Sequence, residues 1–200
     1  QLTQHVLDHY DFSDRAKASA AAFCEEVAQR QAHLVAGWLA VGFVHGVMNT
    51  DNTSIVGETI DYGPCAFLDV YAADAVFSSI DQHRRYAFGR QPCVAKWNVL
   101  KWLEAVYPAL DQQHSSLPTF ADLQLAVANA FDTAFQQAWQ RQMTLKLGFE
   151  WRRPSDTALV QALLDLMEAK ELDYTQTFRA LADTGTLPTA DEPDAADWLV

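Results

Sequence analysis

Residues 45–63 form the stretch of the chain that carries most of its chemical information. They read His45-Gly-Val-Met-Asn-Thr-Asp-Asn52, then Thr-Ser-Ile-Val-Gly-Glu-Thr-Ile60, then Asp61-Tyr-Gly63. Asn52 and Asp61 contribute an amide oxygen and a carboxylate, which are ligands that a hard divalent cation prefers. The β-branched runs at 54–56 and 59–60 flank a Gly-Glu pair and predict a two-stranded hairpin. The stretch therefore predicts a polar loop and a hairpin that bring two metal ligands together.

This order of residues is typical of a kinase catalytic loop followed by a metal-binding turn. Kinases place a base Asp two residues after the His of His-Arg-Asp, then a metal-binding Asn, then the metal ligand of Asp-Phe-Gly. His45, Asn52 and Asp61 match, but the base position is Val47, which cannot accept a proton. The nearest carboxylate, Asp51, is therefore the candidate proton acceptor. We interpret His45 as a structural residue that buttresses the loop.

A simpler interpretation is that the Asp and Asn residues only shape a turn, as these residue types often do. For an isolated Asp-Asn pair that interpretation would be preferred. Here the pair follows His-Gly and precedes a predicted hairpin and Asp-Tyr-Gly. The combination favours a metal–nucleotide site.

The composition limits the classes of partner. Half of the 200 residues are hydrophobic, and 14 basic against 26 acidic side chains give a formal net charge of −12. This balance argues against a nucleic acid or an anionic membrane as a partner. Cys24, Cys65 and Cys93 are odd in number and widely spaced, so they predict neither a zinc knuckle nor a disulfide framework. We expect a reducing compartment, the cytoplasm of a bacterial-type cell.

The rest of the chain predicts a mainly α-helical fold. One long helix is expected over 14–41, ended by Gly42, and another segment, 64–92, is expected to be irregular. Further helices are predicted over 94–106, stopping before Pro108, and over 120–147, 159–169 and 174–182. We expect residues 1–184 to form a helical unit like a kinase C-lobe, with a small β hairpin, and residues 185–200 to form an acidic, Pro-containing tail.

Several side chains allow both a structural and a functional interpretation. The apolar stripe of the first long helix is interpreted as core; it comprises Phe23, Val27, Leu34, Trp38 and Val41. Trp97 and Trp102 are interpreted as core residues and not as a stacking platform for a base. His5 and His9 have the spacing of a helical zinc pair without further ligands, so they are interpreted as surface residues.

A basic cluster stands out in this acidic chain, at Arg84, Arg85 and Arg90. These side chains are candidates to meet nucleotide phosphates or an acidic substrate. Ion pairing with the many carboxylates is the alternative, and both interpretations stay open.

The sequence resembles the selenoprotein O family, pseudokinases that act as protein adenylyltransferases. The resemblance lies in motifs between positions 45 and 92: His45-Gly-Val-Met-Asn-Thr-Asp-Asn52, Ile60-Asp-Tyr-Gly-Pro64, Phe67-Leu-Asp69, Arg85-Tyr-Ala-Phe88 and Gln91-Pro92. It implies that Asp51 is the proton acceptor, that Asn52 and Asp61 bind Mg²⁺ or Mn²⁺, and that Asp61 also contacts ATP. It further implies transfer of AMP from ATP to Ser, Thr or Tyr hydroxyls of proteins.

The chain also departs from the family pattern. The family's glycine-rich loop, ATP-binding Lys and phosphate-binding Arg residues precede the catalytic loop, whereas only 44 residues precede His45. The redox-active residue near the family's C-terminus has no counterpart, since the last Cys is Cys93. We expect this chain to be a central-to-C-terminal piece of a protein more than twice as long, inactive by itself. Thr53, where relatives have Met, is expected to affect packing only.

Two rival functions are weighed against adenylyl transfer. A catalytically silent pseudokinase that binds nucleotide as a scaffold is supported by Val47 at the base position. A small-molecule phosphotransferase of the aminoglycoside type also has a loop that begins His-Gly, but those enzymes keep an Asp directly afterwards, so Val47 argues against it.

Overall fold

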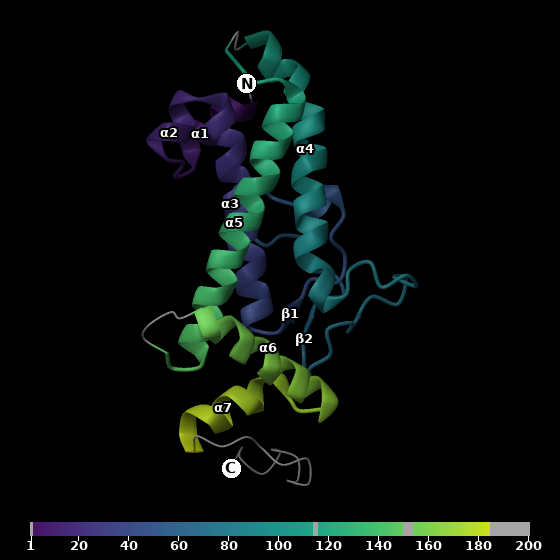
Figure 1. Cartoon of the computed structure of the whole chain (residues 1–200). Coiled ribbons are helices and arrows are strands. Elements are labelled where there is room, and N and C mark those ends of the chain that lie inside the picture. Colours follow the sequence, from purple (N-terminus) through teal and green to yellow (C-terminus); the bar gives the residue numbers. More distant parts are fainter. Residues whose placement is uncertain (1, 114–115, 150–153, 185–200) are drawn as a thin grey trace.

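The computed structural model describes residues 2–113, 116–149 and 154–184, and it is mainly helical (Figure 1). The elements in chain order are α1 (Leu2–His9), α2 (Asp14–Ala18), α3 (Ala20–Ala40), β1 (Phe43–Val44), η1 (Thr50–Asn52), β2 (Ala66–Phe67), η2 (Phe88–Arg90), α4 (Gln91–Gln113), α5 (Phe120–Lys146), α6 (Pro154–Ala169) and α7 (Tyr174–Thr184). The expected mainly helical fold is confirmed. The expected tail at 185–200 lies outside the described residues.

The long helices α3, α4 and α5 pack against one another and form the main core (Figure 1). Phe23 and Val27 are 1% exposed, as the apolar stripe predicted. The stripe then departs from prediction, because Leu34 and Trp38 are half-buried and Val41 is 54% exposed. Three fully buried alanines of α3 fill the middle of the core: Ala28, Ala32 and Ala36. Small side chains let neighbouring helices approach closely, so an alanine face is the buried one here.

The predicted single helix over 14–41 is wrong in one respect, because it is broken at Ser19. Ser19 is extended, with φ −145°, and its side chain accepts a hydrogen bond from the N–H of Ala22. An N-cap of this kind stabilises a new helix start and competes with continuation of the preceding helix. α1 was not predicted at all.

Helix α4 also differs from prediction, because it runs on through Pro108. A proline inside a helix leaves the carbonyl four residues earlier without its donor. Here both Pro108 and Glu104 are exposed, so water can satisfy that carbonyl.

The predicted hairpin at 54–60 is wrong, since this segment contains no strand. The two strands are instead β1 and β2, which pair antiparallel with Phe43 opposite Phe67. Polar groups of segment 54–60 bond to side chains of α3: Gln31 Nε2 donates to Ser54 O at 2.5 Å, and Trp38 Nε1 donates to Thr59 Oγ1 at 2.9 Å. Partners on a helix thus replace the ladder of a local hairpin.

A second core cluster joins α6 and α7 to the end of α3. Tyr174 is fully buried, and its hydroxyl donates to Leu39 O at 2.8 Å. Lys146 Nζ donates to Ala40 O at 2.6 Å, and burial lowers the pKa of Lys146 to about 8. Both side chains satisfy carbonyls at the C-terminus of α3, where intrahelical donors run out. They thereby anchor the point from which β1 and the polar loop begin.

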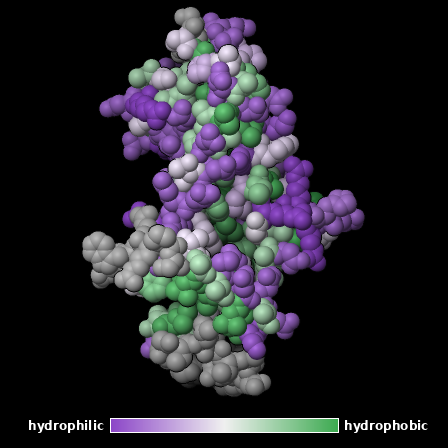
Figure 2. Space-filling model, in the orientation of Figure 1, coloured by the Kyte–Doolittle hydropathy of each residue, from purple (hydrophilic) through white to green (hydrophobic). Residues whose placement is uncertain are grey.

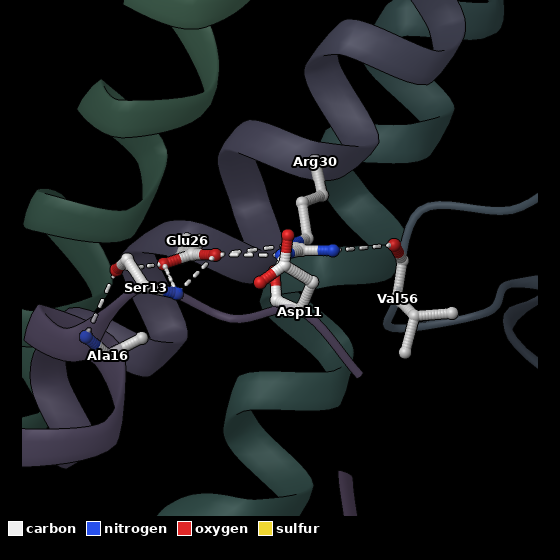
Figure 3. A network of polar contacts seen from close by, with 6 residues as sticks. All are labelled: Asp11, Ser13, Ala16, Glu26, Arg30 and Val56. Carbon is white, nitrogen blue, oxygen red and sulfur yellow. Dashed lines mark hydrogen bonds and ion pairs between the residues drawn. The ribbon is translucent and has the colours of Figure 1, made fainter. Parts of the chain in front are cut away.

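A polar network ties the N-terminal segment to loop 54–60 (Figure 3). The Glu26 carboxylate accepts from Ser13 Oγ at 2.5 Å and from Arg30 Nη2 at 3.0 Å. Arg30 also donates to Asp11 O and, at 3.5 Å, to Val56 O. Partial burial opposes ionisation of Glu26, but the hydrogen bonds from Ser13 and Arg30 outweigh it and lower the pKa of Glu26.

Replacing Glu26 with Gln is expected to lower the free energy of unfolding at pH 7 by about 1–2 kcal/mol, because charge-assisted hydrogen bonds are lost. A depressed folded-state pKa adds stability above the unfolded pKa of about 4.3, and this is lost as pH falls through the folded value. Urea unfolding should therefore show the difference at pH 7 and a much smaller one at low pH. Glu104→Gln, in an exposed pair with Lys101, is the control and should change little. A Glu26→Gln deficit independent of pH would contradict this account.

Candidate functional site

The polar loop that follows β1 is held against the segment leading to Asp61 by His45. This histidine is 1% exposed, and its Nε2 donates to Ile60 O at 2.7 Å, one residue before Asp61. The Nδ1 atom is buried and has no hydrogen-bond partner among the described residues. His45 therefore links the two motifs from the inside, as its structural interpretation predicted.

A close backbone approach at Gly46 makes the second link between the loop and the Asp-Tyr-Gly segment. Gly46 has φ +83°, and a Cβ built on it would lie 2.7 Å from Pro64 O. Only glycine combines this left-handed conformation with so near a backbone neighbour.

Gly46→Ala is expected to reduce the free energy of unfolding by about 3 kcal/mol, through backbone strain and the clash with Pro64. Gly148→Ala is the matched control, since Gly148 has φ +75° and a Cβ added there would have nothing within 4 Å. That variant should lose only the conformational cost of about 1 kcal/mol. Chemical denaturation of both variants measures the difference, and equal losses would show that the approach to Pro64 is unimportant.

Two buried polar side chains of α4 hold the loop in place, and neither was predicted to have this role. Gln91 Oε1 accepts from the N–H of His45 at 2.9 Å, and Gln91 Nε2 donates to Phe43 O at 2.9 Å. Asn98 Nδ2 donates to Met48 O at 3.1 Å and to Thr53 Oγ1 at 3.0 Å. Gln91 and Asn98 are seven residues apart, two helical turns, so they share one face. That spacing of polar residues on a buried face was the available signal.

A third support comes from the segment before α4. Tyr86 Oη donates to Asn49 Oδ1 at 2.6 Å. The Asp81 carboxylate accepts from the backbone N–H groups of Arg85 and Tyr86, each at 2.8 Å. This turn presents Tyr86 to the loop, and it too was not predicted from the sequence.

The predicted metal ligands lie on the surface of this framework. Asn52 ends η1, and its Nδ2 donates to Val47 O at 3.0 Å, which leaves Oδ1 as its acceptor atom. Asp61 is exposed, with φ +54°. Asp61 therefore follows an irregular segment, whereas the predicted hairpin at 54–60 would have placed it after a strand. Asp is one of the few residue types that tolerate this conformation.

The predicted proton acceptor, Asp51, directly precedes Asn52 in η1 and is exposed. Val47, at the position of the kinase base, is half-buried, and its carbonyl is the partner of the Asn52 amide. The loop thus contains one free carboxylate beside the Asn52 amide.

The two predicted ligands, Asn52 and Asp61, offer oxygen atoms of the kind that a hard divalent cation prefers. Within the described residues, no cluster of three or more His, Cys, Asp and Glu side chains could hold a metal by itself. Magnesium is commonly bound by one or two protein oxygens, with phosphates and water completing its shell. The free Oδ1 of Asn52 and the carboxylate of Asp61 match that chemistry.

An exposed aromatic surface adjoins Asp61. Tyr62 is 66% exposed and Phe67 is 61% exposed. Their rings lie 6.3 Å and 5.4 Å from that of Phe43, in edge-to-face geometry. Large exposed apolar side chains of this kind are typical of binding surfaces.

The other candidates divide between core and surface. The core interpretation of Trp97 is wrong, because Trp97 is 43% exposed and the Arg85 guanidinium lies 4.9 Å from its ring centroid. Trp102 is half-buried and packs edge-on against Phe23 at 5.9 Å. Arg84 forms an ion pair with Asp74.

The His5 and His9 rings lie 4.1 Å apart, and both residues are exposed, as their surface interpretation predicted. All three cysteines are free thiols. No helix in the part of the chain that the structure describes is long and apolar enough to cross a membrane.

Comparisons with known proteins agree with these motifs. The family model described as "Protein adenylyltransferase SelO" matches residues 1–196. A protein named "Protein nucleotidyltransferase YdiU" from Rhizobium etli is 44% identical over 208 residues, which cover 99% of this chain and 41% of the relative. Proteins of the same name from Methylorubrum extorquens and Bradyrhizobium diazoefficiens are 45% and 44% identical, with 98% of this chain and 39% of each relative covered. The chain thus spans about two fifths of the length of these relatives.

Proposed function

The chain belongs to the protein adenylyltransferase SelO family, and from that premise we propose that the protein containing it transfers AMP from ATP to Ser, Thr or Tyr hydroxyls of other proteins. This chain carries the half of the site that binds the metal and accepts the proton. The observation that carries the proposal is the pair of links between the two motifs. The hydrogen bond from His45 to Ile60 and the approach of Gly46 to Pro64 set the loop bearing Asp51 and Asn52 against the segment bearing Asp61.

Asn52 and Asp61 are the residues that would hold Mg²⁺ or Mn²⁺, with Asp61 also near the nucleotide. The ion would neutralise charge on the ATP phosphates. This role is supported by the hydrogen bond from Asn52 Nδ2 to Val47 O, which leaves Oδ1 as the acceptor atom of that side chain. Burial of His45 and Gln91 beneath the loop keeps the ligand-bearing backbone in place.

In this proposal, Asp51 accepts the proton of the substrate hydroxyl. As that proton moves to the carboxylate, the hydroxyl oxygen forms a bond to the α-phosphorus of ATP and pyrophosphate leaves. An exposed position suits this role, since the acceptor comes from a second protein. Val47, at the position of the kinase base, cannot accept this proton.

Labelled ATP distinguishes adenylyl from phosphoryl transfer. The full-length protein is incubated with candidate protein substrates and ATP labelled at either the α- or the γ-phosphate. We expect label from the α position to become protein-bound and label from the γ position to be released as pyrophosphate. Protein-bound label from the γ position alone would contradict the proposal and indicate an ordinary kinase.

A silent nucleotide-binding scaffold is the second candidate, and Val47 at the kinase base position favours it. The two functions differ in turnover, because a scaffold binds ATP without releasing pyrophosphate. This 200-residue chain alone is proposed to be inactive and to bind ATP weakly, since it spans only about two fifths of the length of its relatives. Calorimetry that showed micromolar affinity for the chain alone would contradict this expectation.

A further inference from the structure

A basic pocket lies beside the loop, between the segment that precedes α4 and the first turns of α4. It has a volume of about 580 Å³ and is lined by His83, Arg85, Arg90, Cys93, Val94 and Trp97. Figure 1 shows this segment projecting from the side of the long helices, and Figure 2 shows the same edge of the molecule as hydrophilic. The pocket is open to solvent, so a side chain of another protein can enter it.

Two positive charges in this pocket are unpaired in a chain that is strongly acidic. Within the described residues, Arg84 pairs with Asp74, Lys96 with Asp132 and Lys101 with Glu104. Arg85 and Arg90 form no ion pair there, although the chain has 26 acidic side chains against 14 basic ones. Arg84 therefore follows the ion-pair interpretation of the basic cluster. Arg85 and Arg90 stay candidates for binding a ligand.

The Arg85 guanidinium lies against the aromatic ring of Trp97, an arrangement that suits the binding of an anion. Its guanidinium lies 4.9 Å from the ring centroid of Trp97, and Arg90 Nη1 donates to His83 O at 3.4 Å. An arginine held over an aromatic ring keeps its N–H edge free for a carboxylate, which it can bind with two parallel hydrogen bonds. The Asp81 carboxylate accepts from the backbone N–H groups of Arg85 and Tyr86, so it holds the turn itself.

The pocket is connected to the candidate site by two immediate sequence neighbours. Tyr86, next to Arg85, bonds to Asn49, and Asn98, next to Trp97, bonds to Met48 and Thr53. The same turn and the same helix therefore shape the pocket and support the loop that carries Asp51.

We propose that Arg85 and Arg90 bind an acidic side chain of the protein substrate close to its acceptor hydroxyl, so that acidic sequences are the preferred targets. The expected effect on the transfer rate rests on the proposed function. The binding of an acidic side chain to the pocket does not depend on it. Complementary charge between two proteins favours the matching partner over others and speeds their encounter.

Two peptides test the preference: one with a single Tyr flanked by Glu residues and one with Gln in their place. With α-labelled ATP, the full-length wild type is expected to show a kcat/KM about tenfold higher for the Glu peptide, equivalent to one good charge-assisted contact. The Arg85→Gln/Arg90→Gln double variant should lose this preference and retain its rate on the Gln peptide. Arg84→Gln, one residue away and outside the pocket lining, should behave as wild type.

Binding without ATP separates this proposal from the proposed function. Fluorescence anisotropy with a labelled Glu peptide should show about tenfold weaker binding to the double variant than to wild type or Arg84→Gln. If no peptide receives label, adenylyl transfer to such peptides fails and the anisotropy result still decides the pocket. Equal binding of the Glu and Gln peptides to wild type, or equal binding of the Glu peptide to wild type and the double variant, would overturn the pocket proposal.

Discussion

Full-length protein carrying Asp61→Ala is expected to transfer AMP about a thousandfold more slowly than wild type. Asp61 is the only charged side chain of the proposed metal pair, and Asn52 supplies only a neutral oxygen. Losing several kcal/mol of charge stabilisation corresponds to about three orders of magnitude in rate. Transfer of α-labelled AMP to protein, measured at saturating ATP, gives the loss directly.

Asp61→Asn separates the charge from the backbone conformation in this experiment. Asp61 has φ +54°, a region that Asn tolerates well and Ala does not. Both variants should be nearly inactive, and binding of Mn²⁺ with ATP should weaken in both. Glu58→Gln, an exposed carboxylate in the same loop region, is the control and should remain active. Wild-type activity in Asp61→Asn would refute the assignment of Asp61 as a ligand.

Asp51→Asn is expected to lower the rate of transfer by a factor of about 10²–10⁴, the usual contribution of a positioned general base. Asp51 is exposed, so the free energy of unfolding should change by no more than about 0.5 kcal/mol. ATP affinity should also persist, because the proton acceptor is distinct from the metal ligands. Single-turnover rates and equilibrium nucleotide binding, measured on the same preparation, separate the two effects.

An Asp51→Asn variant with near-normal kcat would exclude Asp51 as the base. The scaffold candidate would be favoured only if the wild-type protein also released no pyrophosphate.

The helices were largely predictable because their signals are local. Helix α5, at Phe120–Lys146, agrees closely with the predicted 120–147. The errors arose where a single residue decided between two local options. Ser19 caps a new helix where a continuous one was expected, and Pro108 is accommodated on an exposed face of α4. The resemblance to a kinase C-lobe stays a prediction that family membership supports.

The candidate site was predictable in its reactive residues and not in its supports. Asp51, Asn52 and Asp61 were recognised from one contiguous motif, and their roles stay predictions. Gln91 and Asn98 were missed, because their partners are 46 and 50 residues away in sequence, at His45 and Met48. No local pattern indicates which carbonyl a buried amide will meet.

The sequence by itself therefore determined the helical class, the family and the candidate chemistry, since each depends on residue types within a turn or a short motif. The tertiary structure decided that β1 pairs with β2, that loop 54–60 packs on α3, and that Trp97 is exposed beneath Arg85. The strand pairing and the packing of loop 54–60 share one physical reason. A buried backbone polar group must find a partner, and packing of distant segments decides which partner lies within reach.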